Sequence, residues 1–123
     1  MDKRLLGKWG EELAAKYLRR KRYKIIGAGY RTRFGEIDVI AENRQYVVFA
    51  EVKLRKDDAV ATAAEFVDAK KRKRLLTAAA QWLAKEDTDK QPRFDVVEIY
   101  APEGTATAKP VINHIENAFG EDF

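Results

Sequence analysis

Apolar and polar residues alternate with a period of two through the neighbouring segments 35–40 and 49–53. This is the period of a β-strand, whose successive side chains point to opposite faces of a sheet. The polar residues 41–45 between the two segments are typical of a turn, so we expect a β-hairpin. Apolar residues lie next to the charged ones on both segments, which favours central strands over an exposed edge.

The remaining pattern predicts helices around these strands. Leu6, Trp9, Leu13 and Tyr17 recur at helical spacing. The other predicted elements are a helix over 2–21, a strand over 23–31, a loop over 56–64, a helix over 63–85 and strands over 93–100 and 111–115, the last of them short. The face of the second helix expected to pack on the sheet consists of Leu75, Leu76, Ala79, Ala80 and Leu83.

The order of these elements is αβββαβ followed by a short C-terminal strand. It predicts an α/β fold in which a mixed sheet is flanked by helices. The chain has 123 residues and no internal repeat, so we expect one domain spanning residues 1–123.

The hairpin brings a candidate site together. Strand alternation puts Glu51 and Lys53 on one face, and pairing of the strands places Asp38 beside Glu51. Mg²⁺ and Mn²⁺ prefer carboxylate oxygens, completed by water and phosphate. A lysine beside such a site can orient a water or neutralise a phosphate. The pattern therefore predicts metal-dependent hydrolysis of a phosphodiester, although a chain with 36% charged residues can also carry this spacing on a solvated strand face.

Basic residues are concentrated in two stretches, although the net charge is only +4. Eight of them and no acidic residue lie between Leu13 and Gly35, and five follow one another at 70–74. Basic flanks around an acidic centre suit a polyanion such as DNA. The residues expected to contact nucleic acid are Arg31, Arg33, Lys70, Lys71 and Arg74. The alternatives are solvated faces, or ion pairs of the two arginines with Glu36 or Glu42.

Other classes of function find little support. The chain has no cysteine, which excludes disulfides and thiolate metal sites and fits a cytoplasmic protein. It has no apolar run long enough to span a membrane, no signal-peptide stretch at its start and no glycine-rich phosphate loop. We expect His114, the only histidine, to be structural, and likewise Asp95 and Glu98.

The motif residues resemble a known signature. Gly35-Glu36-Ile37-Asp38 followed by Glu51-Val52-Lys53 is similar to the PD-(D/E)xK nuclease motif, with Ile37 where the proline would stand. Over nearly its whole length the chain resembles the YraN-like family of small bacterial proteins. The segments that carry this likeness include 7–11, 30–38, 49–53, 93–97 and 114–119, together with Lys71 and Arg74-Leu75.

That family is similar to archaeal Holliday junction resolvases of the restriction-endonuclease-like fold. The resemblance implies a DNA endonuclease, active on branched DNA, with Asp38 and Glu51 as ligands of Mg²⁺ or Mn²⁺ and Lys53 as the catalytic lysine. A glutamate of the first helix would join the metal site, and Glu11 matches it, with Glu12 as the other candidate. Junction resolvases are dimers, so a homodimer is also to be tested. Two alternatives to an enzyme stay open: a non-catalytic DNA-binding accessory protein, and an acidic cluster that serves as a cation-stabilised element of the fold.

Overall fold

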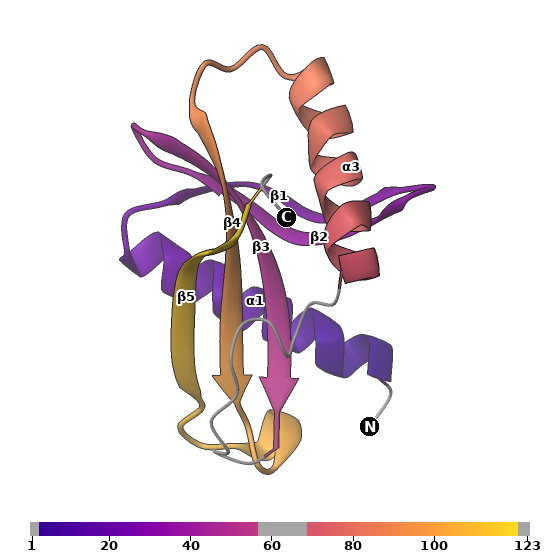
Figure 1. Cartoon of the computed structure of the whole chain (residues 1–123). Helices are drawn as coiled ribbons and strands as arrows, with labels where there is room; N and C mark the ends of the chain where they lie inside the picture. Colours follow the sequence, from indigo (N-terminus) through magenta and orange to yellow (C-terminus); the bar gives the residue numbers. More distant parts are fainter. Residues whose placement is uncertain (1–2, 57–68, 121–123) are drawn as a thin grey trace.

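The computed structural model describes residues 3–56 and 69–120. In this part of the chain, two long helices lie on opposite faces of one five-stranded sheet (Figure 1). The elements are α1 (Lys3–Arg20), β1 (Lys24–Thr32), β2 (Gly35–Glu42), β3 (Tyr46–Arg55), α3 (Ala69–Lys85), β4 (Gln91–Tyr100), a short 3₁₀ turn (Gly104–Ala106) and β5 (Val111–Phe119). The predicted mixed sheet flanked by helices is confirmed. Except for Lys56, the predicted loop 56–64 lies outside the described residues, as does the start of the predicted second helix.

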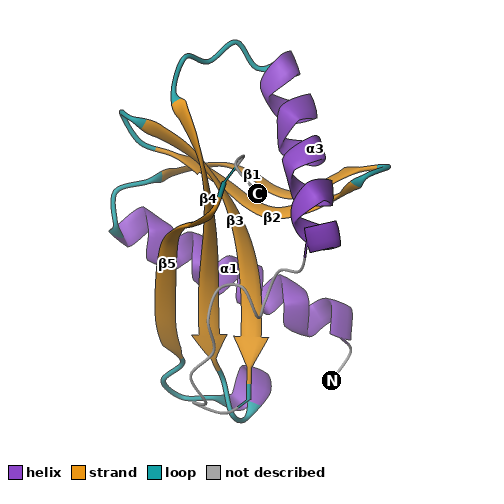
Figure 2. Cartoon of the chain, in the orientation of Figure 1, coloured by secondary structure: helices purple, strands orange, loops and turns teal. Residues whose placement is uncertain are grey.

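The strands lie in the sheet in chain order, β1-β2-β3-β4-β5. The pairs β1/β2, β2/β3 and β4/β5 are antiparallel, whereas β3 and β4 are parallel. A parallel pair needs a crossover, and the stretch between β3 and β4 that contains α3 provides it (Figure 2).

The β2–β3 hairpin opens at one end into a fork. Its paired register runs from Glu42↔Val47 to Val39↔Ala50 and stops there. Beyond this point β2 turns away from β3 toward the lower end of α3 (Figure 1). The next residues on each side of the fork are Asp38 and Glu51, so the strands diverge at the two predicted ligands.

Apolar side chains fill both faces of the sheet. One cluster lies between the sheet and α3 and the other between the sheet and α1. On α3, Leu75, Ala78, Ala79 and Trp82 follow the i, i+3, i+4, i+7 rule and face the sheet. The predicted Leu76 and Leu83 pack against the same cluster. The predicted face was wrong at Ala80, which is exposed because it lies about 100° around the helix from Ala79.

The last strand is longer than predicted. The sequence favoured 111–115, but β5 continues to Phe119, which pairs with Phe94 of β4 and stacks on its ring at 5.1 Å. A register shift between Phe94 and Val96 and a left-handed φ of 51° at Asn117 allow the strand to continue.

Two buried carboxylates lie on opposite faces of β4, as alternation requires. Asp95 accepts hydrogen bonds from Arg93 (2.7 Å), from His114 (2.7 Å) and from the Asn117 N–H (3.0 Å). Glu98 accepts hydrogen bonds from Tyr100 (2.7 Å) and Asn113 (3.1 Å). His114 packs edge-on against Tyr17 of α1. Asp95 and His114 thus tie β5, β4 and α1 together.

Neither described helix is long and apolar enough to cross a membrane.

Candidate functional site

Asp38 lies at the fork between β2 and β3. Its Oδ2 accepts a hydrogen bond of 2.8 Å from the Val52 N–H, a group on β3 that β2 no longer pairs. This contact fixes the carboxyl group at the mouth of the fork. The local sequence explains the position, because Ile37 and Val39 on either side are both fully buried and hold the strand in place.

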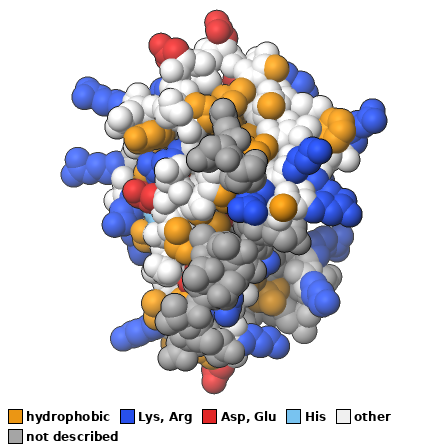
Figure 3. Space-filling model, viewed as in Figure 1, with side chains coloured by type: hydrophobic (Ala, Val, Ile, Leu, Met, Phe, Trp, Pro, Cys, Tyr) orange, Lys and Arg blue, Asp and Glu red, His pale blue; other side chains and the backbone are white. Residues whose placement is uncertain are grey.

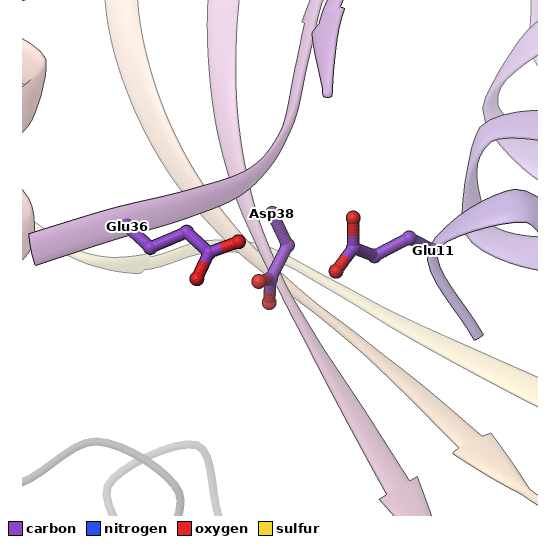
Figure 4. Close-up of side chains that lie close together, drawn as sticks. All are labelled: Glu11, Glu36 and Asp38. Carbon is purple, nitrogen blue, oxygen red and sulfur yellow. The ribbon is translucent and has the colours of Figure 1, made fainter. Parts of the chain in front are cut away.

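Glu11 and Glu36 lie beside Asp38. One carboxylate oxygen from each of the three residues lies within 4.8 Å of the other two. Figure 4 shows Asp38 of β2 between Glu36 of the same strand and Glu11 of α1, whose side chains point toward it from opposite sides. Gly10 permits this approach, since a Cβ at that position would lie only 3.2 Å from Leu54 of β3. Glu11 therefore occupies the position left open in the sequence, whereas Glu12 is exposed.

Gly29 on β1 leaves room for these carboxylates. Its φ of +59° is in the left-handed region that favours glycine. A Cβ at Gly29 would lie 3.7 Å from Glu36 Oε1 and 3.9 Å from Glu11 Oε1. A side chain that extends beyond Cβ at this position would take up the space next to the Glu36 and Glu11 carboxylates, between α1 and β2.

Glu51 adds a fourth carboxylate on the β3 side of the fork. Its side chain is buried close to Asp38 and forms an ion pair of 2.5 Å with Lys71 Nζ of α3. The predicted pair of Asp38 and Glu51 is thus adjacent, and α3 supplies the positive charge that balances it.

The carboxylates raise one another's proton affinity. Burial and the nearby charges of Glu51 and Glu11 raise the pKa of Asp38 to about 8, against the opposing hydrogen bond from Val52. Burial and the charges of Glu36 and Glu51 also raise the pKa of Glu11, which Arg31 partly offsets. Negative charge is crowded here beyond what the neighbouring cations neutralise.

A hard divalent cation fits this donor set. All four side chains offer carboxylate oxygens, which are the ligands preferred by Mg²⁺ and Mn²⁺. A bound cation would also relieve the repulsion that raises the pKa of Asp38. The residues that could hold it are Glu11, Glu36, Asp38 and Glu51.

A basic cleft opens from the carboxylates toward α3. It has a volume of about 510 Å³ and is lined by Asp38, Glu51 and Glu36 together with Lys70, Lys71 and Arg74. The start of β2 packs closely on α3 here, since a Cβ at Gly35 would lie 3.4 Å from Arg74 Cβ. We call this the α3 cleft. Three of the five residues predicted to contact nucleic acid line it.

The two predicted arginines differ in position. Arg31 forms an ion pair of 3.5 Å with Glu36, at the edge of the carboxylate cluster. Arg33 lies in the β1–β2 turn, with its guanidinium 5.1 Å from the centre of the Phe34 ring. Glu42, the other partner considered, pairs instead with Lys90.

Lys53 lies two residues beyond Glu51 on the same strand and is half-buried. Its register partner on β4 is Glu98. Lys53 is not among the described residues that line the clefts around the carboxylates. Of the predicted catalytic residues, the described structure thus groups Asp38, Glu51 and Glu11 and leaves Lys53 outside the two cleft linings.

Glu36 was not predicted as a ligand. The signal was present, because alternation already placed Glu36 on the same face as Asp38. The spacing of residues along β2 did not reveal that this strand bends away from β3, which places Glu36 beside Glu11. The bend depends on how the whole sheet is built and leaves no pattern in the motif residues.

A family model and several relatives of this chain carry the same description. A family model described as "Uncharacterised protein family UPF0102" matches residues 10–99. A UPF0102 protein of Nocardia farcinica is 42% identical over 119 residues, which cover 96% of this chain and 91% of the relative. Another from Alkaliphilus oremlandii is 42% identical over 122 residues, covering 97% and 100%. A third, from Syntrophomonas wolfei, is 43% identical over 119 residues, covering 94% and 98%. The YraN-like resemblance is confirmed, and the chain belongs to the uncharacterised protein family UPF0102.

Proposed function

We propose that this protein is a metal-dependent endonuclease that hydrolyses phosphodiester bonds in DNA. One observation carries the proposal: four carboxylates from three elements converge at the fork, and the cleft that leads to them is walled by the cations of α3. Carboxylate oxygens bind the cation that this reaction needs, while the basic wall binds a polyanion. An acidic cluster without the basic wall would not favour a phosphodiester substrate.

Each group in the site has a proposed role. Glu11, Glu36, Asp38 and Glu51 hold Mg²⁺ or Mn²⁺. When bound, the cation would polarise the phosphate and stabilise the negative charge that develops on it. Lys53 orients the attacking water, whose oxygen forms a bond to phosphorus and loses a proton to solvent as the bond to the leaving deoxyribose oxygen breaks.

The basic residues bind the substrate in this proposal. Lys70, Lys71 and Arg74 contact phosphates next to the scissile one, and Arg31 borders the cluster through Glu36. Branched DNA is the proposed substrate shape, following the likeness of the family to junction resolvases.

The test is cleavage of a labelled panel that contains duplex, single strand, flap and four-way junction, with Mg²⁺ or Mn²⁺. We expect wild type to cleave, and Asp38→Asn and Lys53→Ala to lose cleavage by at least about 100-fold while still binding DNA. Glu103→Gln and Lys109→Ala remove the same kinds of charge from an exposed loop and serve as matched controls. Equal cleavage by all variants would reject this site. Firm binding without cleavage by wild type would support the accessory-protein alternative.

A further inference from the structure

A second cleft lies on the other side of the carboxylates from α3. It has a volume of about 650 Å³ and is formed by α1 and β1 together with Glu36 of β2. The basic residues that line it are Lys3, Arg4, Lys8, Arg19 and Arg31. We call this the α1 cleft. The proposed function gives no role to the four cations of α1 in this cleft, Lys3, Arg4, Lys8 and Arg19.

The two clefts meet at the carboxylate cluster. Glu36 lines both of them, Glu11 lines the α1 cleft, and Asp38 lines the α3 cleft. The cluster is therefore flanked by a basic wall on each side, one from each helix. Lys and Arg side chains also gather around the lower part of α3 in Figure 3, with few acidic side chains in between.

Two of the cations of α1 present their charges on the same face of the helix. Arg4 and Lys8 are both exposed and lie four residues apart, so they share a face of the helix. A polyanion in the cleft would contact both of these charges.

The spacing of these charges suits a row of phosphates. Lys8 lies three residues before Glu11, so it begins within one helical turn of the carboxylates. Arg4 lies about 6 Å further along the axis of α1, a step comparable to that between successive phosphates of one strand. The row leads away from the cluster along α1, toward the start of the helix.

We propose that the α1 cleft binds the DNA backbone on the far side of the scissile phosphate. One strand then runs from the α3 cleft, over the carboxylates, into the α1 cleft. This inference rests on the proposed function and extends it, because it makes the carboxylates the middle of the binding path rather than its end.

The test compares three double variants in DNA binding. Arg4→Ala/Lys8→Ala removes two cations of the α1 cleft, and Lys70→Ala/Arg74→Ala removes two of the α3 cleft. The matched control is Lys16→Ala/Arg20→Ala, an exposed pair on α1 with the same spacing that lines neither cleft. Binding of a labelled single strand of about 20 nucleotides is measured by fluorescence anisotropy, with Ca²⁺ in place of Mg²⁺ to prevent cleavage.

We expect the Arg4/Lys8 and Lys70/Arg74 variants each to weaken binding about tenfold or more at about 0.1 M salt, with a salt slope smaller by about 1–2. The control pair should change the affinity by less than about twofold, with circular dichroism spectra unchanged throughout. Equal losses in the Arg4/Lys8 variant and the control pair would reject the α1 cleft in favour of bulk charge. A loss only in the Lys70/Arg74 variant would also reject it, yet leave the proposed nuclease intact. No binding by wild type to any DNA would overturn both.

Discussion

Asp38 meets two opposing demands. It is held in a partly buried fork beside other carboxylates, and this raises its pKa from 3.8 to about 8. An acid whose pKa is raised on folding keeps its proton in the folded state at pH values where the unfolded chain has lost it. The free energy of unfolding therefore falls as pH rises between these two pKa values. The position of Asp38 suits the binding of a cation, but it lowers the free energy of unfolding of the metal-free protein.

Asp38→Asn should stabilise the metal-free protein for this reason. Asparagine can still accept the hydrogen bond from the Val52 N–H, but it carries no charge. We expect the thermal midpoint in EDTA to rise by about 3–8 °C at about pH 8, and by much less at about pH 5. Glu103→Gln, on an exposed loop, is the control. A variant less stable than wild type at both pH values would contradict the repulsion inferred for the fork.

Lys71 should compete with a metal ion for Glu51. Its ammonium lies 2.5 Å from Glu51 Oε1, where it neutralises the carboxylate. In Lys71→Met the stem is kept and the charge is lost, so we expect Mn²⁺ to bind about 3–10-fold more tightly in calorimetric titration, a gain of about 1 kcal/mol.

The control for Lys71 is Lys70→Met, which removes a lysine of the same cleft that has no ion pair with Glu51. Both variants should weaken DNA binding. Weaker Mn²⁺ binding in Lys71→Met alone would mean that Lys71 supports the metal site rather than competing for it.

At the scale of residues, the sequence predicts which two side chains lie opposite each other on paired strands better than it predicts which side chains from several elements gather at one site. Strand alternation was sufficient to bring Asp38 and Glu51 together, because a hairpin determines which residues are opposite. The grouping with Glu11 and Glu36 depends on where α1 crosses the sheet and where β2 bends. Neither has a signature in residue spacing, so Glu36 was missed and Glu11 rested on resemblance.

At the scale of elements, the buried network of β4 and β5 holds the far side of the sheet. Burial alone would raise the pKa of Asp95, but hydrogen bonds from His114, Arg93 and the Asn117 N–H outweigh it and hold the pKa below its usual value. A carboxyl group with a lowered pKa stabilises the fold above its unfolded pKa of about 4. That contribution is lost as the pH falls through the folded pKa.

Asp95→Asn should therefore destabilise the protein strongly. It leaves the buried guanidinium of Arg93 without its buried charged partner, with only the exposed Glu116 nearby, and breaking a buried pair in this way costs about 3–5 kcal/mol. Urea unfolding at neutral pH measures the loss. The free energy of unfolding of the variant should also fall less in acid than that of wild type, because the variant has no Asp95 carboxyl group to protonate.

Glu116→Gln is the control, because Glu116 is 61% exposed and lies 3.8 Å from the same guanidinium. We expect it to change stability by less than about 1 kcal/mol. Equal effects of the two substitutions would show that the network contributes no more than a surface pair.

The elements themselves were largely predictable, since periodicity identifies amphipathic strands and helices directly. The errors have local causes. The end of β5 was missed because a bulge at Asn117 breaks the alternation while pairing continues. Ala80 was wrongly placed on the buried face because alanine occurs readily in both buried and exposed positions. Trp82, which was not assigned to that face, packs against Phe49.

At the scale of the whole molecule, the carboxylate cluster links parts of the fold that are otherwise held by apolar packing. Glu11 comes from α1, Asp38 from β2 and Glu51 from β3, while Lys71 brings in α3 from the opposite face of the sheet. A cation bound here would join α1 to β2 and β3 at the centre of the sheet. Metal binding and global stability should therefore be coupled.

Mn²⁺ should raise the thermal midpoint of wild type and leave that of Asp38→Asn nearly unchanged. At about 100 times its dissociation constant, an ion that binds only the folded state contributes about 2.7 kcal/mol, which corresponds to several degrees for a domain of this size. Amide hydrogen exchange around Glu11 and Val52 should slow in the same titration, because both segments contact the cluster. An equal shift in the two proteins would place the ion elsewhere. A shift confined to wild type, in a protein that cleaves none of the DNA panel, would instead identify the cluster as a cation-stabilised element of the fold.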